Sequence, residues 1–182
     1  ISWISKVREV AAKNGKSIGP SHLIADEGGL GLPFASIGAA ISYVSTTAAP
    51  PPSAAQPWTI RVFPGHYMES NLVLPSYVVL LGLDQDACII DGQGLSSHIL
   101  TMSNYSSAYA LTIQNAPAPY AAVFNNSSSF AFQMMEITMQ FSHVGMWLQN
   151  DAATSVFAYL NDCAFSGNQS VNLFMNSQLG TE

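Results

Sequence analysis

Carboxylates that could act as a general acid, a general base or a nucleophile are scarce in most of this chain. The 182 residues include 11 Asp and Glu side chains. After Asp91 the acidic residues are Glu136, Asp151, Asp162 and Glu182. Hydrolysis of a glycosidic bond needs two carboxylates placed close together. Glu136 and Asp162 are the weak catalytic candidates, because they belong to strand-like runs at equivalent places in a repeating pattern.

Side chains that bind metals show no useful spacing. The histidines are His22, His66, His98 and His143. They are scattered along the chain, and Cys88 and Cys163 form no CxxC pattern. Metal sites usually reveal themselves by short fixed spacings of His and Cys. The sequence therefore predicts no metal and no cofactor, and each cysteine is predicted to be a buried free thiol.

Aromatic side chains offer a different chemistry, the stacking of rings on sugars. The candidates for a carbohydrate-binding surface are Tyr105, Tyr109, Tyr120 and Trp147, with His143 beside the tryptophan. Such residues have a large apolar face and a polar edge, which suits a sugar ring. The alternative is that these rings pack laterally on a sheet surface.

The charge distribution excludes several classes of partner. The net charge is −6, and only five residues are Lys or Arg. Four of them lie within the first sixteen positions, which makes residues 1–28 a separate contact segment. A chain without a basic stripe cannot neutralise phosphates, so nucleic acid is not an expected partner. No apolar run reaches the roughly 18 residues of a membrane span.

Two helices precede a long series of short strands. Residues 4–14 and 34–44 carry apolar side chains at helical spacing. In the second helix these are Ile37, Ala40, Ile41 and Val44. From Trp58 onward, short apolar runs are broken by Gly, Asn, Ser and Pro, as is typical of strands. The predicted strands span 58–63, 72–74, 77–81, 88–90, 98–102, 110–113, 121–124, 130–139, 145–148, 156–160, 163–165 and 171–175.

Similar strands recur at a nearly constant interval. One series ends in Asn104, Asn126, Asn150 and Asn176, which advance by 22, 24 and 26 residues. Recurring strands imply stacked coils, since one coil cannot bury its apolar face alone. The sequence therefore predicts an all-β fold, a right-handed parallel β-helix or solenoid, with asparagines stacked at a bend. It would span 29–182, capped by the helix at about 34–44, and an antiparallel β-sandwich is the alternative.

Four segments resemble the pectin-lyase-like β-helix superfamily and occur in its order. They are 29–41, 60–69, 78–92 and 111–115. The first resembles the Gly-rich opening and capping helix, the second a strand followed by Pro64-Gly65, and the last the Leu-Thr-Ile-Gln-Asn strand of pectin methylesterases. The resemblance implies a β-helix and, for an esterase, two catalytic carboxylates with assisting glutamines and an arginine.

The residues that this resemblance requires for catalysis are missing. The first acid would fall near 143–147, which contains no carboxylate, and the second near 167–174, where the closest match is Asn172. An amide cannot act as the nucleophile or the general base. The expected glutamine would fall near Tyr120, and no arginine follows Arg61. The sequence therefore argues against esterase activity by this mechanism.

A β-helix with few charges, many Ser and Asn residues and a separate N-terminal helix resembles structural components of virions, such as spikes, fibres or capsid-associated decorations. This implies a virion or extracellular location. The implied protein partners are further copies, such as a trimer, or capsid proteins, engaged through the N-terminal helix. A glycan is a further possible ligand.

Two functional alternatives remain open, a polysaccharide-active enzyme of the pectin esterase, lyase or hydrolase type and a carbohydrate-binding module. Residues 171–175 begin another coil, so we expect further chain or a partner to cover that end.

Overall fold

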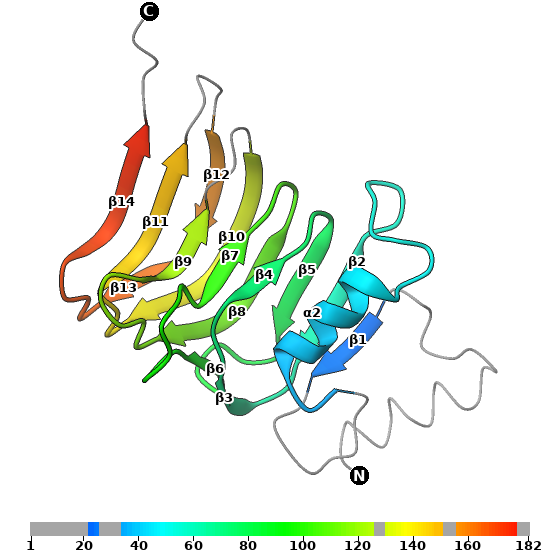
Figure 1. The fold of residues 1–182 in the computed structure, drawn as a ribbon, viewed down its shortest axis with the longest axis horizontal. Helices are drawn as coiled ribbons and strands as arrows, with labels where there is room; N and C mark the ends of the chain where they lie inside the picture. The colour runs from blue at the N-terminus through cyan, green and yellow to red at the C-terminus, as the bar shows by residue number, and fades with distance from the viewer. Residues whose placement is uncertain (1–21, 26–33, 126–129, 151–155, 178–182) are drawn as a thin grey trace, which may run out of the picture.

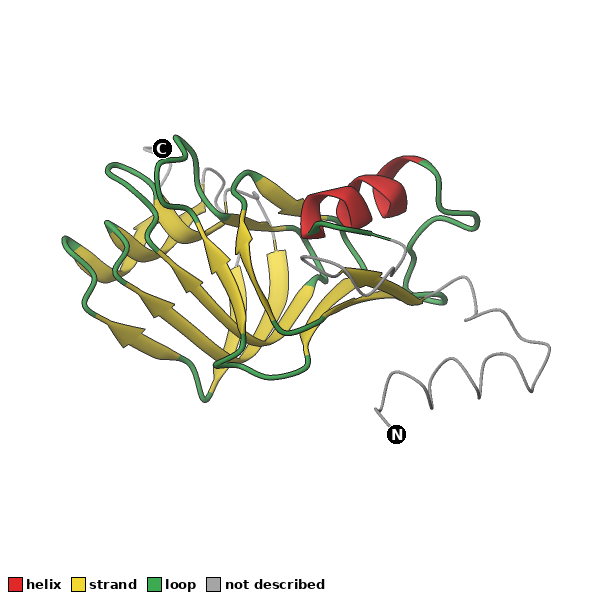
Figure 2. Cartoon of the chain, turned by 90° about the horizontal axis from the view of Figure 1, so that it is seen from below, coloured by secondary structure: helices red, strands yellow, loops and turns green. Residues whose placement is uncertain are grey.

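The structure is a computed structural model that describes residues 22–25, 34–125, 130–150 and 156–177. Strands dominate these residues, and helix α2 lies at one end of a stack of strands (Figures 1 and 2). The helix predicted at 4–14 lies outside the described residues. No helix in the described part of the chain is long and apolar enough to cross a membrane.

Helix α2 spans Ile37–Thr46 and buries one face against the coils. Its buried residues are Ile37, Ala40, Ile41 and Val44, which confirms the predicted apolar face. The helix begins three residues later than the predicted start at 34, because Ser36 caps it. The backbone of Ser36 is extended, and its Oγ accepts a hydrogen bond of 3.1 Å from the Ala39 amide. A serine in this place satisfies an amide that has no partner within the helix.

A carboxylate from the first coil completes the N-terminus of α2. Glu69 follows strand β3 (Gly65–Met68), and its oxygens accept hydrogen bonds from the amides of Ile37 at 2.8 Å and Gly38 at 2.7 Å. Negative charge is favoured at this end of the helix dipole. A Cβ at position 38 would lie 2.9 Å from Oε2 of Glu69, so glycine permits the close approach. Glu69 thereby ties the helix to the coil.

We expect Glu69→Gln to lower the free energy of unfolding by about 1–2 kcal/mol, because the amide loses the charge and one of the two acceptors. Chemical denaturation measures the change. Glu136→Gln is the matched control, since it removes the same charge from an exposed position. Equal losses in the two variants would contradict the capping role.

The strands form two parallel sheets. Their bounds are β1 (His22–Ala25), β2 (Trp58–Val62), β3 (Gly65–Met68), β4 (Leu72–Leu74), β5 (Val78–Gly82), β6 (Cys88–Asp91), β7 (Leu100–Met102), β8 (Ser107–Gln114), β9 (Ala121–Asn125), β10 (Phe130–Gln140), β11 (Val144–Asn150), β12 (Val156–Asn161), β13 (Ala164–Ser166) and β14 (Val171–Ser177). The larger sheet follows the order β1-β2-β5-β8-β10-β12, with β3, β6 and β13 beside this path. The smaller sheet has the order β14-β11-β9-β7-β4.

Every pairing between these described strands is parallel. Parallel neighbours require a long crossover between them, whereas hairpins give antiparallel neighbours. The parallel β-helix is therefore confirmed, and the antiparallel β-sandwich is wrong. Two strands were not predicted. Strand β1 lies within the segment 1–28 and pairs with β2, and β3 buries only Tyr67, so it has no apolar run to reveal it.

The bends between strands stack in columns of residues with positive φ. Ala110, Glu136 and Asp162 have φ values of 51°, 57° and 51°. Tyr109 pairs with Met135 and Leu111 with Ile137, so Ala110 lies opposite Glu136. The same offset of 26 residues places Glu136 opposite Asp162. Positive φ is unfavourable for residues with a Cβ, so it persists only where the surrounding strands fix it.

The asparagine ladder expected at one bend is wrong in its register. Gln149 pairs with Asn176, and Asn150 pairs with Ser177, so the two asparagines are displaced by one position. The buried positions give the true repeat. Leu100, Val123, Met146 and Leu173 are successive partners, which sets steps of 23, 23 and 27 residues. The extra residues are accommodated in turns, which change length without moving the buried side chains.

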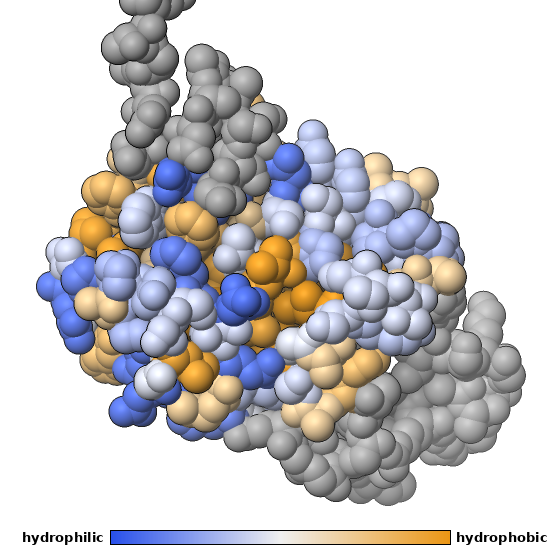
Figure 3. Space-filling model, in the orientation of Figure 1, coloured by the Kyte–Doolittle hydropathy of each residue, from blue (hydrophilic) through white to orange (hydrophobic). Residues whose placement is uncertain are grey.

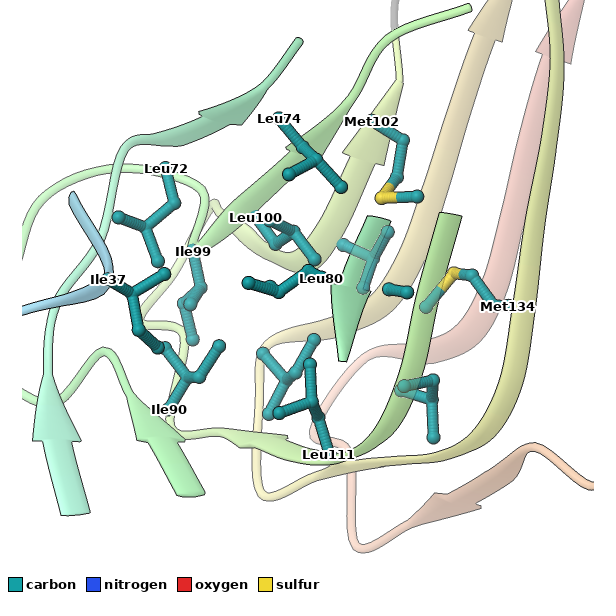
Figure 4. Packing of buried hydrophobic residues seen from close by; sticks show 14 of the residues in the cluster. Ile37, Leu72, Leu74, Leu80, Ile90, Ile99, Leu100, Met102, Leu111 and Met134 are labelled. Atoms are coloured by element: carbon teal, nitrogen blue, oxygen red, sulfur yellow. The ribbon is translucent and has the colours of Figure 1, made fainter. Parts of the chain in front are cut away.

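The core fills the inside of the coils with one contiguous apolar cluster. Ile37 of α2 meets Leu72 and Ile99 at one end, and Met134 lies farther along the axis (Figure 4). Inward positions of the strands are almost fully buried, as in β2 and β5, where buried and half-buried residues alternate. Burial of each such side chain contributes about 1.5–3 kcal/mol. This core fixes which residues of each strand face outward.

Candidate functional site

The smaller sheet carries a continuous row of outward-facing side chains. Val73, Thr101, Phe124, Trp147 and Phe174 are successive register partners on β4, β7, β9, β11 and β14. Their sequence neighbours on these strands point into the core, because side chains alternate along a strand. We call these five residues the outer row. The row crosses every strand of the smaller sheet.

Five rings form an aromatic cluster on this row. They are His98, Tyr120, Phe124, Trp147 and Phe174. The His98 ring stacks on Phe124 with centroids 4.0 Å apart, and it meets Tyr120 edge-on at 5.5 Å. Trp147 stands nearly perpendicular to Phe124 at 5.7 Å and to Phe174 at 5.4 Å. These are favourable ring geometries, and each ring is at least partly exposed.

His98 is held as a neutral ring in this cluster. Its Nδ1 accepts a hydrogen bond of 3.0 Å from the Ala121 amide, so the proton is on Nε2. Burial lowers the pKa of His98 below its ordinary value of 6.5. Protonation would set a positively charged donor against the amide of Ala121. The ring therefore supplies a donor but no charge at neutral pH.

Because its pKa is lowered, His98 should make stability depend on pH. The unfolded chain binds the proton first as pH falls, so this stability is present above about pH 6.5 and decreases below it, towards the folded pKa. We expect urea unfolding to show the slope between about pH 7.5 and about pH 5. His98→Asn, which keeps an acceptor for the amide, should flatten it. His143→Asn is the control, and an equal flattening there would contradict the assignment.

The strands of the smaller sheet contain no Asp, Glu, Lys or Arg. The places at which the family resemblance requires acids lie beside the outer row, at Val144 and Asn172. Asn172 Oδ1 accepts a hydrogen bond of 3.0 Å from Asn168, whose own oxygen accepts one from the Ser142 amide. The surface is therefore an arrangement of rings, amides and hydroxyls without charge.

The residues predicted to bind carbohydrate divide between the two sheets. Tyr120 and Trp147 belong to the aromatic cluster, and His143 precedes β11 on the same sheet. Tyr105 instead stacks on Tyr77 with ring centroids 5.2 Å apart. The Tyr109 hydroxyl donates to Gln133 on the larger sheet. The prediction missed His98, Phe124 and Phe174, although the 23-residue spacing of Phe124 and Trp147 is visible in the sequence.

Glu136 and Asp162 lie opposite each other at a bend of the larger sheet, and both are exposed. This placement agrees with the expected outer face of adjacent coils. The two carboxylates are separated from the aromatic cluster by the core, because the cluster lies on the other sheet. They therefore do not form one site with the rings.

A buried carboxylate organises a second polar network. Asp91 is 2% exposed, and its Oδ2 accepts from His66 Nε2, Gln114 Nε2 and Asn115 Nδ2 at 2.8, 2.8 and 2.9 Å. Its Oδ1 accepts from the Gln93 amide. Burial alone would raise the pKa of Asp91, but these hydrogen bonds outweigh it and hold the pKa below the ordinary value. The network cross-links coils rather than exposing a reactive acid.

Metal-binding groups and reactive thiols are not found together. Among the described residues, no three His, Cys, Asp or Glu side chains are placed to hold a metal ion. Cys88 and Cys163 are free, as predicted, with Cys88 buried and Cys163 partly buried. Burial raises the pKa of both thiols, which keeps them protonated and unreactive at neutral pH.

A cleft of about 590 Å³ opens between α2 and β4. Its apolar lining appears in Figure 3 as a hydrophobic hollow beside α2. The cleft is lined by Gly38, Ile41, Ser42, Ser45, Thr46, Met68, Glu69, Ser70, Asn71, Leu72, Val73 and Leu95. Val73 also begins the outer row, so the cleft and the row are continuous.

Known structures show what this fold resembles. No protein-family model matches the sequence, and no curated protein is similar to it. Pectin methylesterase PemA from Erwinia chrysanthemi matches with a TM-score of 0.56 and 17% identity over 80% of this chain and 49% of that structure. A second pectin methylesterase, bound to a hexasaccharide, matches with a TM-score of 0.54 and 15% identity over 79% of this chain.

The chain spans about half of those enzymes, 49% of one and 54% of the other. At such low identity the likeness concerns the arrangement of strands. The coils, the capping helix and the order of the four motifs agree with this likeness. The chain therefore has the pectin-lyase-like parallel β-helix fold that its motifs predicted.

Proposed function

We propose that this chain is a non-catalytic structural β-helix that contacts glycans through the aromatic cluster. Its role would be attachment or assembly as a component of a virus particle, such as a spike, a fibre or a capsid-associated decoration. The observation that supports this proposal is the outer row itself, which carries rings where an esterase would need acids. Val144 and Asn172 occupy those places, and neither side chain can attack an ester or activate water.

The cluster has the properties of a surface that stacks on sugars. Phe174 is 40% exposed, and the neighbouring rings are partly exposed. The buried Nε1 of Trp147 has no hydrogen-bond partner in the structure. Buried donors are normally paired. A sugar hydroxyl that approached the indole after a small ring rotation would supply the acceptor, which favours a polar ligand over an apolar one.

We expect Trp147→Ala to weaken glycan binding by about tenfold or more, since the central ring of the cluster is lost. A glycan array followed by calorimetry on the strongest ligand measures this. Tyr159→Ala is the matched control, because Tyr159 is 60% exposed on the larger sheet. Thermal unfolding separates lost binding from lost folding, and Trp147→Phe should keep most of the affinity. Equal binding by wild type and Trp147→Ala would overturn the assignment.

The role in a particle has its own test. Peptides of this chain should be recovered in a fixed ratio to the major capsid protein when particles from its source are purified and analysed by mass spectrometry. Sedimentation analysis should give an oligomer such as a trimer. A monodisperse monomer that is absent from purified particles would contradict the virion role while leaving glycan binding intact.

A polysaccharide-active enzyme is the second candidate, and the observation that favours it is the adjacency of Glu136 and Asp162. Two neighbouring carboxylates can divide the roles of acid and base. Release of reducing ends or unsaturated products from acidic polysaccharides would support this candidate. Glu136→Gln and Asp162→Asn should each abolish such an activity, whereas Trp147→Phe should not.

A further inference from the structure

The outer row and the cleft beside α2 form one elongated surface parallel to the axis of the coils. The row advances by one strand at each residue from Val73 to Phe174. Strands in a sheet are about 4.8 Å apart, so its four steps span roughly 19 Å. One step is close to the length of one pyranose in an extended chain. The surface therefore matches a linear oligosaccharide of about four residues, with the cleft as a further pocket at one end.

This surface has no positive charge with which to bind an acidic sugar. The strands of the smaller sheet carry no charged residue, and His98 is neutral. Recognition of carboxylates depends on Arg or Lys. Arg61 belongs to the larger sheet. The ionisable group of the cleft is Glu69, whose negative charge would repel a uronic acid.

The polar groups along the surface suit hydroxyls. Ser45 and Thr46 donate to carbonyls of α2 and keep lone pairs for a ligand donor. Ser42, Ser70 and Asn71 add further donors and acceptors around the cleft. Glu69 is occupied by two helix amides, so its carboxylate is positioned and does not need a cation from the ligand. Uncharged donors and acceptors next to apolar carbons are the pattern that neutral sugars present.

Resting on the proposed glycan contact, we infer that the ligand is an uncharged, linear glycan that lies along the outer row with one end in the cleft between α2 and β4. This ligand class differs from the acidic chains that uronic-acid-binding surfaces select. The rings would stack on successive sugars, and the cleft would enclose the terminal unit. Binding should be insensitive to salt, because no ion pair forms.

Calorimetric titration with neutral oligosaccharides of two to six units tests the inference, using cello-, manno- and xylo-oligosaccharides, with hexagalacturonate as the acidic probe. We expect at least one neutral series to bind, with affinity rising up to about four to five units and unchanged by added salt. Hexagalacturonate should not bind. Ser42→Phe should fill the cleft and remove the gain from the longest chains by about tenfold. Ala39→Phe, exposed on the same helix outside the cleft, is the matched control.

The outcomes separate the inference from the function on which it rests. Binding of hexagalacturonate in preference to every neutral hexamer, with loss in Trp147→Ala, would overturn the neutral ligand while the glycan contact survives. Affinity that is the same in Ser42→Phe and wild type for all lengths would overturn the placement of the chain end. Absence of binding by every neutral and acidic probe would overturn the inference and the glycan contact together.

Discussion

Gly82→Ala is expected to prevent stable folding of the chain. Gly82 ends β5, and a Cβ built on it would lie 1.9 Å from the carbonyl oxygen of Ala110 and 2.9 Å from a methyl of Leu111. The oxygen belongs to the backbone of β8, which pairs with β5 and with β10. It cannot move without breaking these ladders. We expect a loss of at least about 3 kcal/mol, a large part of the stability of an ordinary domain.

Circular dichroism and thermal unfolding of Gly82→Ala measure this effect, together with soluble yield. Gly94→Ala provides the contrast, because Gly94 has a φ of +76° but no atom within 4 Å of the added Cβ. That variant should lose only about 1 kcal/mol, for the strained backbone. If the two variants are equally stable, the close contact of β5 with β8 is not a constraint.

Asp91→Ala should be the most damaging loss of a polar side chain. The carboxylate accepts from Gln114, Asn115 and His66 and from one backbone amide, and alanine leaves these donors without their acceptor. Removing one partner of a buried charged network costs about 3–5 kcal/mol. Asp86→Ala is the matched control, since Asp86 is exposed. Urea unfolding of the three proteins gives the comparison.

The same residue predicts how the protein responds to acid. Since the folded pKa of Asp91 is lowered, its stabilisation is present above the ordinary value of 3.8 and is lost as pH falls through the folded value. The wild type should therefore lose stability more steeply than Asp91→Ala at about pH 3 and below. Parallel profiles for the two proteins would show that the carboxylate does not stabilise the fold.

The coils were predictable because their cause is local. Each strand of the β-helix is a short apolar run between turn residues, so the sequence marks it directly. Strand β3 escaped because only Tyr67 is buried. The helix start at Ile37 depends on the Ser36 cap and on Glu69, which is distant in sequence. Distant partners leave no periodic signal.

The candidate site was only half predictable, because it depends on register. Aligning Ala122 with Met146 places Val123 opposite Trp147, whereas the structure pairs Phe124 with Trp147. A slip of one residue exchanges the inner and outer faces of a strand. That slip concealed Phe124, and the neighbours His98 and Phe174 with it. Tyr105 and Tyr109 were grouped with Trp147 by residue type alone, although they lie on the other sheet.

The parallel pairing also determines how the chain must acquire its structure in time. Trp58 pairs with Val78 and Gly65 with Cys88, so a strand finds its partner only after a loop of some twenty residues has closed. Such long-range pairing makes folding slow, and the first two coils carry most of this entropic barrier. Each later coil adds to a surface that already exists. We expect assembly to start beside α2 and to proceed along the axis, in the direction in which a ribosome delivers the coils.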